Sequence, residues 1–218
     1  ACEKGEQWQQ ALSLLRELLL EAELTPDILS YNAGISACEK GGHWQQGLSL
    51  LRELWTAELQ PDAVSYSASI SACEKCFQWQ RSLSLLSEML EVEVEPDIRS
   101  FNNGVSACEK GKQWRLALSL LDEACRAKLE LDARSCLAGI SACGITGQWR
   151  EVLSLLHEAW QGRVALGTIA HTAGMSACVS AGQWRQAVAL LGAGFGAALE
   201  PDVASHSVGA RAWLSAGR

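Results

Sequence analysis

The chain alternates between two patterns of apolar and polar positions, and both have the period of an α-helix. Within residues 28–62, Tyr31, Ile35 and Cys38 follow the spacing i, i+4, i+7, which predicts a first helix with one apolar face. The glycines at 41–42 then interrupt the pattern. A second pattern places small or apolar residues at i, i+3, i+4, i+7 and i+11: Trp44, Gly47, Leu48, Leu51 and Trp55. Residues 28–62 are therefore predicted to form a helical hairpin that ends at a Pro-Asp pair.

This hairpin recurs along the chain with a period of 35 residues. The period is visible in the cysteines Cys38, Cys73, Cys108, Cys143 and Cys178 and in the tryptophans Trp44, Trp79, Trp114, Trp149 and Trp184. Self-similarity of this length is typical of stacked supersecondary units. Because one hairpin cannot bury two apolar faces, we predict that the units stack into an all-α solenoid.

The limits of the units follow from cutting the chain after each Pro-Asp and continuing the 35-residue period. The predicted units are a partial repeat 1–27, the repeats 28–62, 63–97, 98–132, 133–167 (degenerate) and 168–202, and a partial repeat 203–218. Neither end carries the polar capping unit that a solenoid needs, so we expect the sequence to be a piece of a longer protein.

Composition and charge narrow the classes of protein. Of the 218 residues 48% are apolar and 20% are charged, which excludes a disordered chain. The longest apolar run, 188–199, is too short to cross a bilayer, and we expect no membrane association. Residues 1–97 carry a net charge of −10 and residues 98–218 carry +3, which makes −7 in total. This balance argues against a general polyanion binder, so any nucleic acid must be held by local contacts.

The cysteines and histidines do not form a catalytic or metal-binding motif. Five of the nine cysteines share one position on the buried side of the first helix, where a small apolar residue fits. Cys73 and Cys76 have C-x-x-C spacing, but Cys76 occupies a turn position that is glycine in other repeats, and no second pair follows. The four histidines occupy unrelated positions in the repeat. We therefore expect no metal, no cofactor and no enzymatic activity, and persistent thiols that fit a reducing compartment.

The unit ILSYNAGISACEKGGHWQQGLSLLRELWTAELQPD resembles the pentatricopeptide repeat. The matching features are Ser-Tyr-Asn at the start of the first helix, Cys-Glu-Lys-Gly at its end, Leu-Ser-Leu-Leu in the second helix and the terminal Pro-Asp. The resemblance is strongest in 28–132 and weakest in 133–167. One departure is that Trp44 and its equivalents stand where the family more often has a smaller aliphatic residue. The resemblance implies a right-handed superhelical α-solenoid of 35-residue helix-turn-helix repeats that binds single-stranded RNA, about one base per repeat.

In this family each base is read by the residue after the aromatic residue of the first helix, together with the last residue of the same unit. The corresponding pairs here are Asn32 with Asp62, Ser67 with Asp97, Asn102 with Asp132, and Thr172 with Asp202. The family associates Asn–Asp pairs with uracil and Thr–Asp pairs with guanine, and Ser67 is similar to that threonine. Leu137 with Gly167 matches no reading pair. The resemblance therefore implies the base order U-G-U-N-G.

The resemblance also implies which side chains hold the bases and phosphates. Bases stack against a side chain early in each first helix, a position held here by Leu29, Val64, Arg99, Arg134 and Ile169. Lysines near the end of the first helix approach phosphate, and here they are Lys40, Lys75 and Lys110. The next two repeats have Ile145 and Ser180 instead, so RNA contacts are expected to weaken beyond residue 132.

These residues also have purely structural explanations, which the sequence leaves open. Aspartate after proline and asparagine near a helix start are common cap and turn residues, and lysine complements a helix C-terminus. The reading position nevertheless varies among Asn, Ser, Leu and Thr beside a constant Ser-Ala-Cys, which favours a ligand.

Three functions follow from this sequence. The first is an RNA-binding adaptor in organellar RNA processing, stability, editing or translation, in a mitochondrion or chloroplast, with protein partners that supply an effector activity. The alternative is a protein–protein interaction scaffold of the helical-repeat type. The third is a repeat tract that has retained no ligand.

Overall fold

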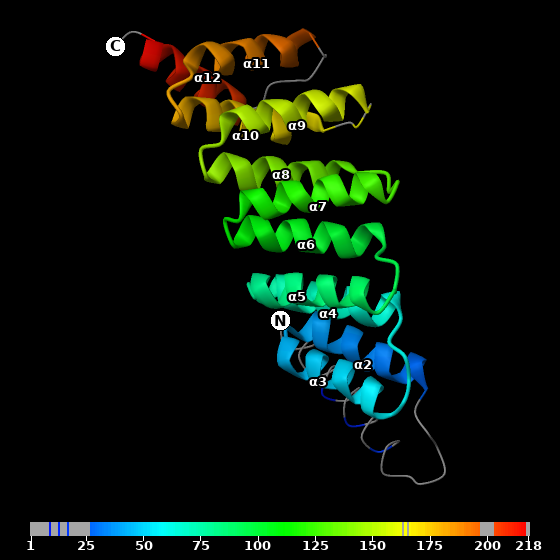
Figure 1. Ribbon diagram of the computed structural model, residues 1–218. Helices are drawn as coiled ribbons and strands as arrows, with labels where there is room; N and C mark the ends of the chain where they lie inside the picture. Colours follow the sequence, from blue (N-terminus) through cyan, green and yellow to red (C-terminus); the bar gives the residue numbers. More distant parts are fainter. Residues whose placement is uncertain are drawn as a thin grey trace. The chain divides into compact units, whose positions relative to one another are not determined.

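The computed structural model describes residues 27–162, 164, 166–196 and 203–216, together with residues 9, 13 and 17. These residues form the helices α2 to α12, and no strand occurs among them (Figure 1). The all-α helical-repeat fold expected from the periodicity is therefore confirmed for the described residues. Most of the partial repeat 1–27 lies outside them.

The helices alternate between two sets that share the 35-residue period. The first helices are α2 (Ile28–Gly41), α4 (Ala63–Lys75), α6 (Ile98–Lys110), α8 (Ala133–Ile145), α10 (Gly167–Ser180) and α12 (Val203–Ala216). The second helices are α3 (Trp44–Thr56), α5 (Trp79–Glu91), α7 (Trp114–Arg126), α9 (Trp149–Gln161) and α11 (Trp184–Gly196). Every second helix thus begins at the repeated tryptophan.

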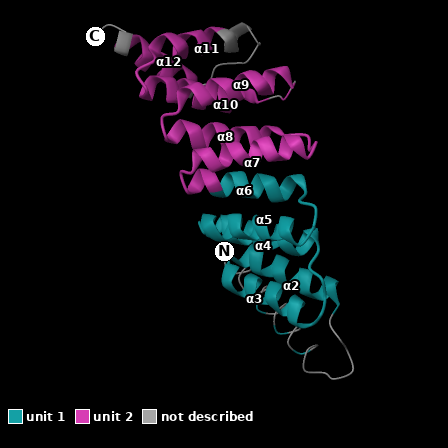
Figure 2. Cartoon of the chain, in the orientation of Figure 1, with its two compact units in different colours: residues 1–107 teal, residues 108–218 magenta. Residues whose placement is uncertain are grey.

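The chain forms two compact units, residues 1–107 and 108–218 (Figure 2). In unit 1, α2 packs against α3 and α4, and α4 packs against α5. In unit 2, α8 packs against α7, α9 and α10, and α10 packs against α11 and α12. Within each unit a first helix therefore contacts both its own second helix and the first helix of the next repeat. The right-handed superhelix stays a prediction.

Aspartate side chains begin the first helices. Asp27, Asp62 and Asp132 have extended backbones, and each accepts a hydrogen bond from the N–H of the serine three residues later, at 2.8–2.9 Å. This bond satisfies one of the N–H groups that the first turn of a helix leaves without a partner. The Pro-Asp that ends one repeat is therefore also the start signal of the next.

The turn between the two helices of a repeat requires a left-handed backbone at one residue. Gly42, Gly147 and Gly182 adopt it with φ of 72–76°, whereas Phe77 and Lys112 adopt it at the same position of their repeats with φ of 60° and 56°. Glycine reaches this conformation without steric cost, and a residue with a Cβ does not. The turn geometry is thus set by the repeat rather than by glycine alone.

The core is densest along the first helices. Every residue from Ser65 to Glu74 of α4 is buried, because α4 has neighbours on more than one side. The same position of the first helix is Ser69 in α4 and glycine at 139 and 174. A Cβ at Gly174 would lie 2.7 Å from Leu156 Cδ1, so a larger residue there would require that leucine side chain to shift.

The buried face of the second helix differs from the predicted one. In α3 the buried residues are Gly47, Leu50, Leu51 and Leu54, whereas Trp55 is 42% exposed. The predicted apolar face was therefore right for Gly47 and Leu51, which are buried, and for Leu48, which is half-buried. It omitted Leu50 and Leu54, and it included Trp55, which is largely exposed. The second Leu of the Leu-Ser-Leu-Leu motif is therefore a main contact.

The five periodic cysteines lie in the core as predicted, each with no exposed surface. Burial raises the pKa of Cys73, Cys143 and Cys178 to about 11 and that of Cys108 to about 12. These thiols stay protonated at neutral pH and act as small apolar side chains.

Candidate nucleic-acid interface

Asn32 and Asp62 are 30 residues apart in sequence and meet in unit 1. The Asn32 Nδ2 donates to Asp62 Oδ1 at 3.1 Å and lies 3.3 Å from Oδ2. On the other side of the amide, Asn32 Oδ1 accepts from the Ser65 hydroxyl at 2.6 Å. The repeat packing therefore brings together the two residues of the first predicted reading pair and adds Ser65, which the sequence analysis did not include.

Asp62 is held in its ionised form by this cluster. Burial raises the pKa of its carboxyl, but hydrogen bonds from the Ser65 backbone, the Ser65 hydroxyl and the Asn32 amide together bring the pKa below its ordinary value of 3.8. An ionised carboxylate only accepts hydrogen bonds, so it fixes which end of the Asn32 amide faces it. Asn32 retains one N–H and one oxygen lone pair, and the side chain is 7% exposed. A ligand would reach it only edge-on.

Ser67 and Asp97 form a different arrangement in the next repeat. Ser67 is buried on α4, and Asp97 caps α6 by accepting from Ser100 N at 2.8 Å and Ser100 Oγ at 2.7 Å. Within the described part of the chain no hydrogen bond joins Ser67 to Asp97. A serine side chain is shorter than asparagine by the amide group, so it does not span the distance that Asn32 spans.

The remaining pairs are described only in part. Asn102 is buried in unit 1, and Asp132 caps α8 in unit 2 through Ser135 N at 2.8 Å, so their pairing stays a prediction. Thr172 Oγ1 donates to the Thr168 carbonyl at 2.8 Å and lies 3.0 Å from Ser205 Oγ. Ser205 has the same register as Ser65. Asp202 lies outside the described residues.

Repeat 133–167 has no polar group at either reading position. Leu137 packs against the apolar core of unit 2, and Gly167 begins α10 with φ of 64° and no side chain. The sequence analysis found no reading pair in this repeat, and the structure likewise places no polar side chain at either position.

The predicted stacking residues lie at the surface. Leu29, Val64 and Ile169 are 70%, 55% and 65% exposed, and Arg99 and Arg134 are also exposed. Each residue is three positions before the reading residue of its repeat, so the two share one helix face. These side chains are therefore accessible to a ligand.

The predicted phosphate lysines Lys40, Lys75 and Lys110 are all exposed in the last turn of their helices. Lys75 forms an ion pair with Glu39, with Nζ 2.7 Å from Oε1. The same Glu39 oxygen accepts from Ser71 Oγ at 2.8 Å, and Glu74 accepts from Ser106 Oγ at 2.6 Å. The structure thus adds a Glu–Ser contact between consecutive first helices. The recurrence of Glu39, Glu74 and Glu109 every 35 residues was the sequence signal for it.

Residues 49–110 match the model of the pentatricopeptide repeat domain. The 35-residue period and the paired helices continue that match on both sides of these residues. This stretch of the chain is therefore similar to the pentatricopeptide repeat domain.

Solved pentatricopeptide repeat structures share this fold over most of the chain. PPR10 in complex with an 18-nt psaJ RNA element matches with a TM-score of 0.76 and 22% identity, over 96% of this chain and 31% of that chain. PPR10 from maize matches with a TM-score of 0.69 and 20% identity, over 93% of this chain and 29% of that chain. The PPR domain of Arabidopsis thaliana protein-only RNase P 1, in complex with tRNA, matches with a TM-score of 0.74 and 12% identity, over 83% of this chain and 95% of that domain. Likeness at these identities shows the fold.

The chain therefore spans about a third of the length of the PPR10 chains that it matches. No curated protein matches it by sequence. Among the described residues, no helix is long and apolar enough to cross a membrane, and no group of three His, Cys, Asp or Glu side chains could hold a metal ion.

The charge of this helical-repeat array is distributed unevenly. In unit 1 the acidic residues Glu91, Glu93 and Glu95 are exposed at the end of α5 and in the segment that follows it. Glu88 differs, since its carboxylate accepts from the Tyr66 hydroxyl at 3.0 Å. The lysines, reading residues and stacking residues all lie on first helices or at their starts.

Proposed function

We propose that this helical-repeat array binds single-stranded RNA and reads about one base per repeat. The observation that carries the proposal is the Asn32–Asp62–Ser65 cluster beside the exposed Leu29. It supplies a fixed polar edge and an apolar surface on one helix face, which is what a splayed base requires. Two of the similar structures, PPR10 with its psaJ RNA element and the RNase P 1 domain with tRNA, are RNA complexes.

The chemistry of the Asn32 amide fits the edge of a pyrimidine. With one N–H donated to Asp62 and the oxygen bonded to Ser65, the amide has one N–H and one lone pair left for a ligand. Uracil offers a carbonyl acceptor next to an N3–H donor, so both remaining groups can be satisfied together. An amide turned around would place its N–H groups toward the Ser65 hydroxyl and lose the bond to the ionised Asp62.

The full register of the proposal is U-G-U-N-G for the repeats from 28–62 to 168–202. Its pairs are Asn32/Asp62, Ser67/Asp97, Asn102/Asp132 and Thr172/Asp202, with repeat 133–167 unread. We place the stacking contacts on Leu29, Val64, Arg99, Arg134 and Ile169 and the phosphate contacts on Lys40, Lys75 and Lys110. Because Lys75 shares its charge with Glu39, we expect Lys40 to contribute more to binding.

The biological role that we propose is an adaptor for organellar RNA processing, stability, editing or translation, in a mitochondrion or chloroplast. The adaptor acts without enzymatic activity of its own, and protein partners supply the effector step. This role rests on the family and on the proposed RNA binding.

Fluorescence anisotropy with short single-stranded RNAs tests the proposal. An RNA containing U-G-U-N-G is compared with permuted RNAs over a salt series, because counterion release makes affinity depend on salt. Asn32→Ala should weaken binding by about 1–3 kcal/mol when uracil faces repeat 28–62, and less when it does not. The matched control is Asn103→Ala. Asn103 follows the proposed reading residue Asn102 in α6 and is as buried as Asn32, but it is not itself a proposed reading residue.

A gain-of-function variant tests base reading by adding a reading pair to the repeat that lacks one. Leu137→Asn with Gly167→Asp should create a uracil preference at the unread base. Binding that is blind to base order in the wild-type chain, or no binding at low salt, would contradict base reading. Binding of proteins with no RNA preference would then favour the scaffold.

A further inference from the structure

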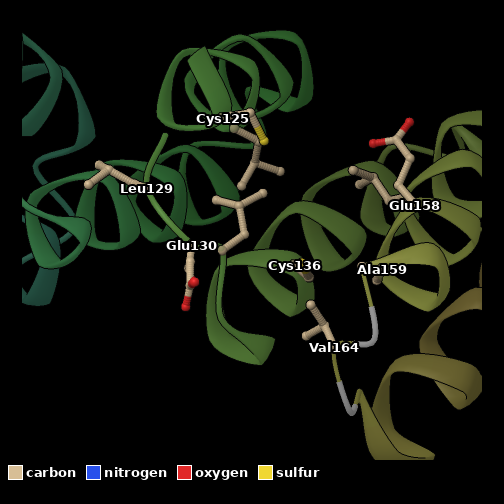
Figure 3. Close-up of a pocket in the computed structure, with 11 residues that line it drawn as sticks. Cys125, Leu129, Glu130, Cys136, Glu158, Ala159 and Val164 are labelled. Carbon is tan, nitrogen blue, oxygen red and sulfur yellow. The ribbon is translucent and has the colours of Figure 1, made fainter. Parts of the chain in front are cut away.

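A partly open cavity of about 570 Å³ lies in unit 2, where the end of α7 meets the start of α8 and the end of α9. Figure 3 shows Cys125, Cys136, Ala159 and Val164 among the side chains around it, with Glu158 at one edge. The other apolar lining residues include Leu121, Leu131 and Leu155. A cavity of this size is in the range that holds small organic ligands.

The cavity lies where other repeats place a pair of large side chains. One member is the aromatic position of a first helix, and the other is a residue near the end of the preceding second helix, 11 residues earlier. The pairs at these positions are Trp55 with Tyr66, Leu90 with Phe101, Cys125 with Cys136, and Trp160 with His171. Only the pair that lines the cavity has two small side chains.

The contacts of the other pairs show what the cavity is missing. Tyr66 is fully buried, and its O–H donates to Glu88 Oε1 at 3.0 Å, while the Trp55 side chain hydrogen-bonds to the phenol. The rings of Trp160 and His171 have centroids 5.2 Å apart. An aromatic ring is therefore the ordinary content of this space in the repeat.

The polar group that meets the ring is retained in the cavity. Glu158 is 22 residues after Cys136, as Glu88 is after Tyr66, and it lines the cavity. Its Oε1 accepts from Ser154 Oγ at 3.1 Å, which leaves acceptor capacity on the carboxylate. The space thus keeps the acceptor for a phenol hydroxyl and lacks the phenol.

The two thiols are apolar parts of a lining that also includes the carboxylates Glu130 and Glu158. Burial raises the pKa of both Cys125 and Cys136, and nearby carboxylates, including Glu158, raise it further. Protonated thiols are small apolar groups with weak hydrogen-bonding ability. An apolar cavity engineered into a protein core by removing a large side chain binds benzene, which shows that an aromatic molecule can fill such a space.

We propose that this cavity is a binding site for a small aromatic molecule with one hydrogen-bond donor, of the phenol or indole class. The ring occupies the space of the missing aromatic side chain between Cys125 and Cys136, and its O–H or N–H donates to Glu158. The site is independent of RNA binding.

Ligand-detected NMR with p-cresol as the probe tests this site in the whole chain. Saturation transfer to p-cresol is expected at about 1 mM ligand, because a small ring in a partly open cavity binds weakly. Toluene, which lacks the donor, should bind roughly threefold to tenfold more weakly than p-cresol. Cys136→Tyr places a ring in the cavity and should weaken p-cresol binding at least roughly tenfold.

Cys178→Ala is the matched control, because it also changes a buried first-helix cysteine of unit 2 but lies outside the cavity lining. It should bind p-cresol like the wild type. Glu158→Leu should remove the difference between p-cresol and toluene while toluene still binds. The proposal is overturned if p-cresol does not bind the folded wild-type chain at millimolar concentration. It is equally overturned if folded Cys136→Tyr binds p-cresol as well as the wild type does.

Discussion

Units 1 and 2 share one backbone frame but differ in the side chains that join consecutive repeats. In unit 1 the described contacts include Asn32 with Asp62, Glu39 with Ser71 and Lys75, and Tyr66 with Glu88. In repeat 133–167 of unit 2 the corresponding positions hold Leu137, Gly144 and Cys136. The frame itself is unchanged, since the cysteine position is fully buried in both units.

This difference separates residues that build the repeat from residues that distinguish it. Loss of the polar pairs and of the aromatic ring leaves α8 and α9 folded, because the helix pair is stabilised by the apolar residues Ile140, Val152 and Leu156 in its core. The positions that vary are those that face a neighbouring repeat or the proposed ligand. Side chains at these positions can therefore change without loss of the helix pair.

The largest expected effect comes from giving unit 1 the cavity of unit 2. Tyr66→Cys removes a fully buried ring and its hydrogen bond to Glu88, so unfolding free energy should fall by about 3–5 kcal/mol. Urea unfolding followed by circular dichroism measures the change. The reciprocal Cys136→Tyr should raise the unfolding midpoint of unit 2, whereas an equal loss of stability in both variants would show that the two sites are not equivalent.

Removal of the Asp62 side chain should have the next largest effect. Asp62→Ala loses the cap of α4 and the partner of Asn32, at a cost of about 1–2 kcal/mol in stability. Asp132→Ala loses the equivalent cap of α8 but belongs to the proposed reading pair of a different base, so it is the control for capping at the first uracil. RNA affinity at the first uracil should fall only for Asp62→Ala, and a fall of the same size at that base in Asp132→Ala would contradict the register.

The same carboxylate predicts a pH dependence. Because the folded pKa of Asp62 is below its ordinary value, its contribution to stability is complete above the unfolded pKa of about 3.9 and is lost as pH falls through the folded pKa. Wild type should therefore be more stable than Asp62→Asn at neutral pH, and the difference should shrink under acid. A difference that stays constant from pH 7 to about 2 would exclude this linkage.

Turn substitutions should change stability by a smaller amount. Lys112 has a φ of 56° where Gly147 has 76°, so Lys112→Gly should stabilise the chain by about 0.5–1 kcal/mol. Gly147→Lys should destabilise it by a similar amount for the same reason. Thermal unfolding of the two variants measures both changes, and stabilisation by Gly147→Lys would show that this backbone is not strained.

The smallest expected effect concerns the Glu39–Lys75 ion pair. Lys75 is about half exposed, so Glu39→Gln should lower stability by less than about 0.5 kcal/mol. Without the Glu39 carboxylate, the positive charge of Lys75 becomes available to phosphate. Affinity for the proposed RNA should then rise about twofold to threefold at low salt. Lys75→Ala supplies the comparison, since it should decrease the salt dependence of binding instead. Weaker RNA binding by Glu39→Gln would place Lys75 away from phosphate.

Sequence alone determined the repeat and its helices. A 35-residue period and the apolar spacing of Tyr31, Ile35 and Cys38 specify helix pairs because local hydrogen bonds and a continuous apolar face depend on nearby residues. The Pro-Asp-x-x-Ser sequence likewise specifies a cap within four residues. The helix pair recurs along the described part of the chain, and the aspartate cap recurs at α2, α4, α6 and α8 but not at α10.

Only the tertiary structure decided which distant side chains meet. Packing of α2 against α4 brings Asn32 to Asp62 and turns Lys75 toward Glu39, so a lysine that reads as free in the sequence is an ion-pair partner. It also decided that Leu50 and Leu54 join the buried face of α3, that Trp55 is largely exposed, and that two cysteines line one cavity. Such outcomes depend on the rotation and distance between whole helices, which the sequence pattern of a single helix does not contain.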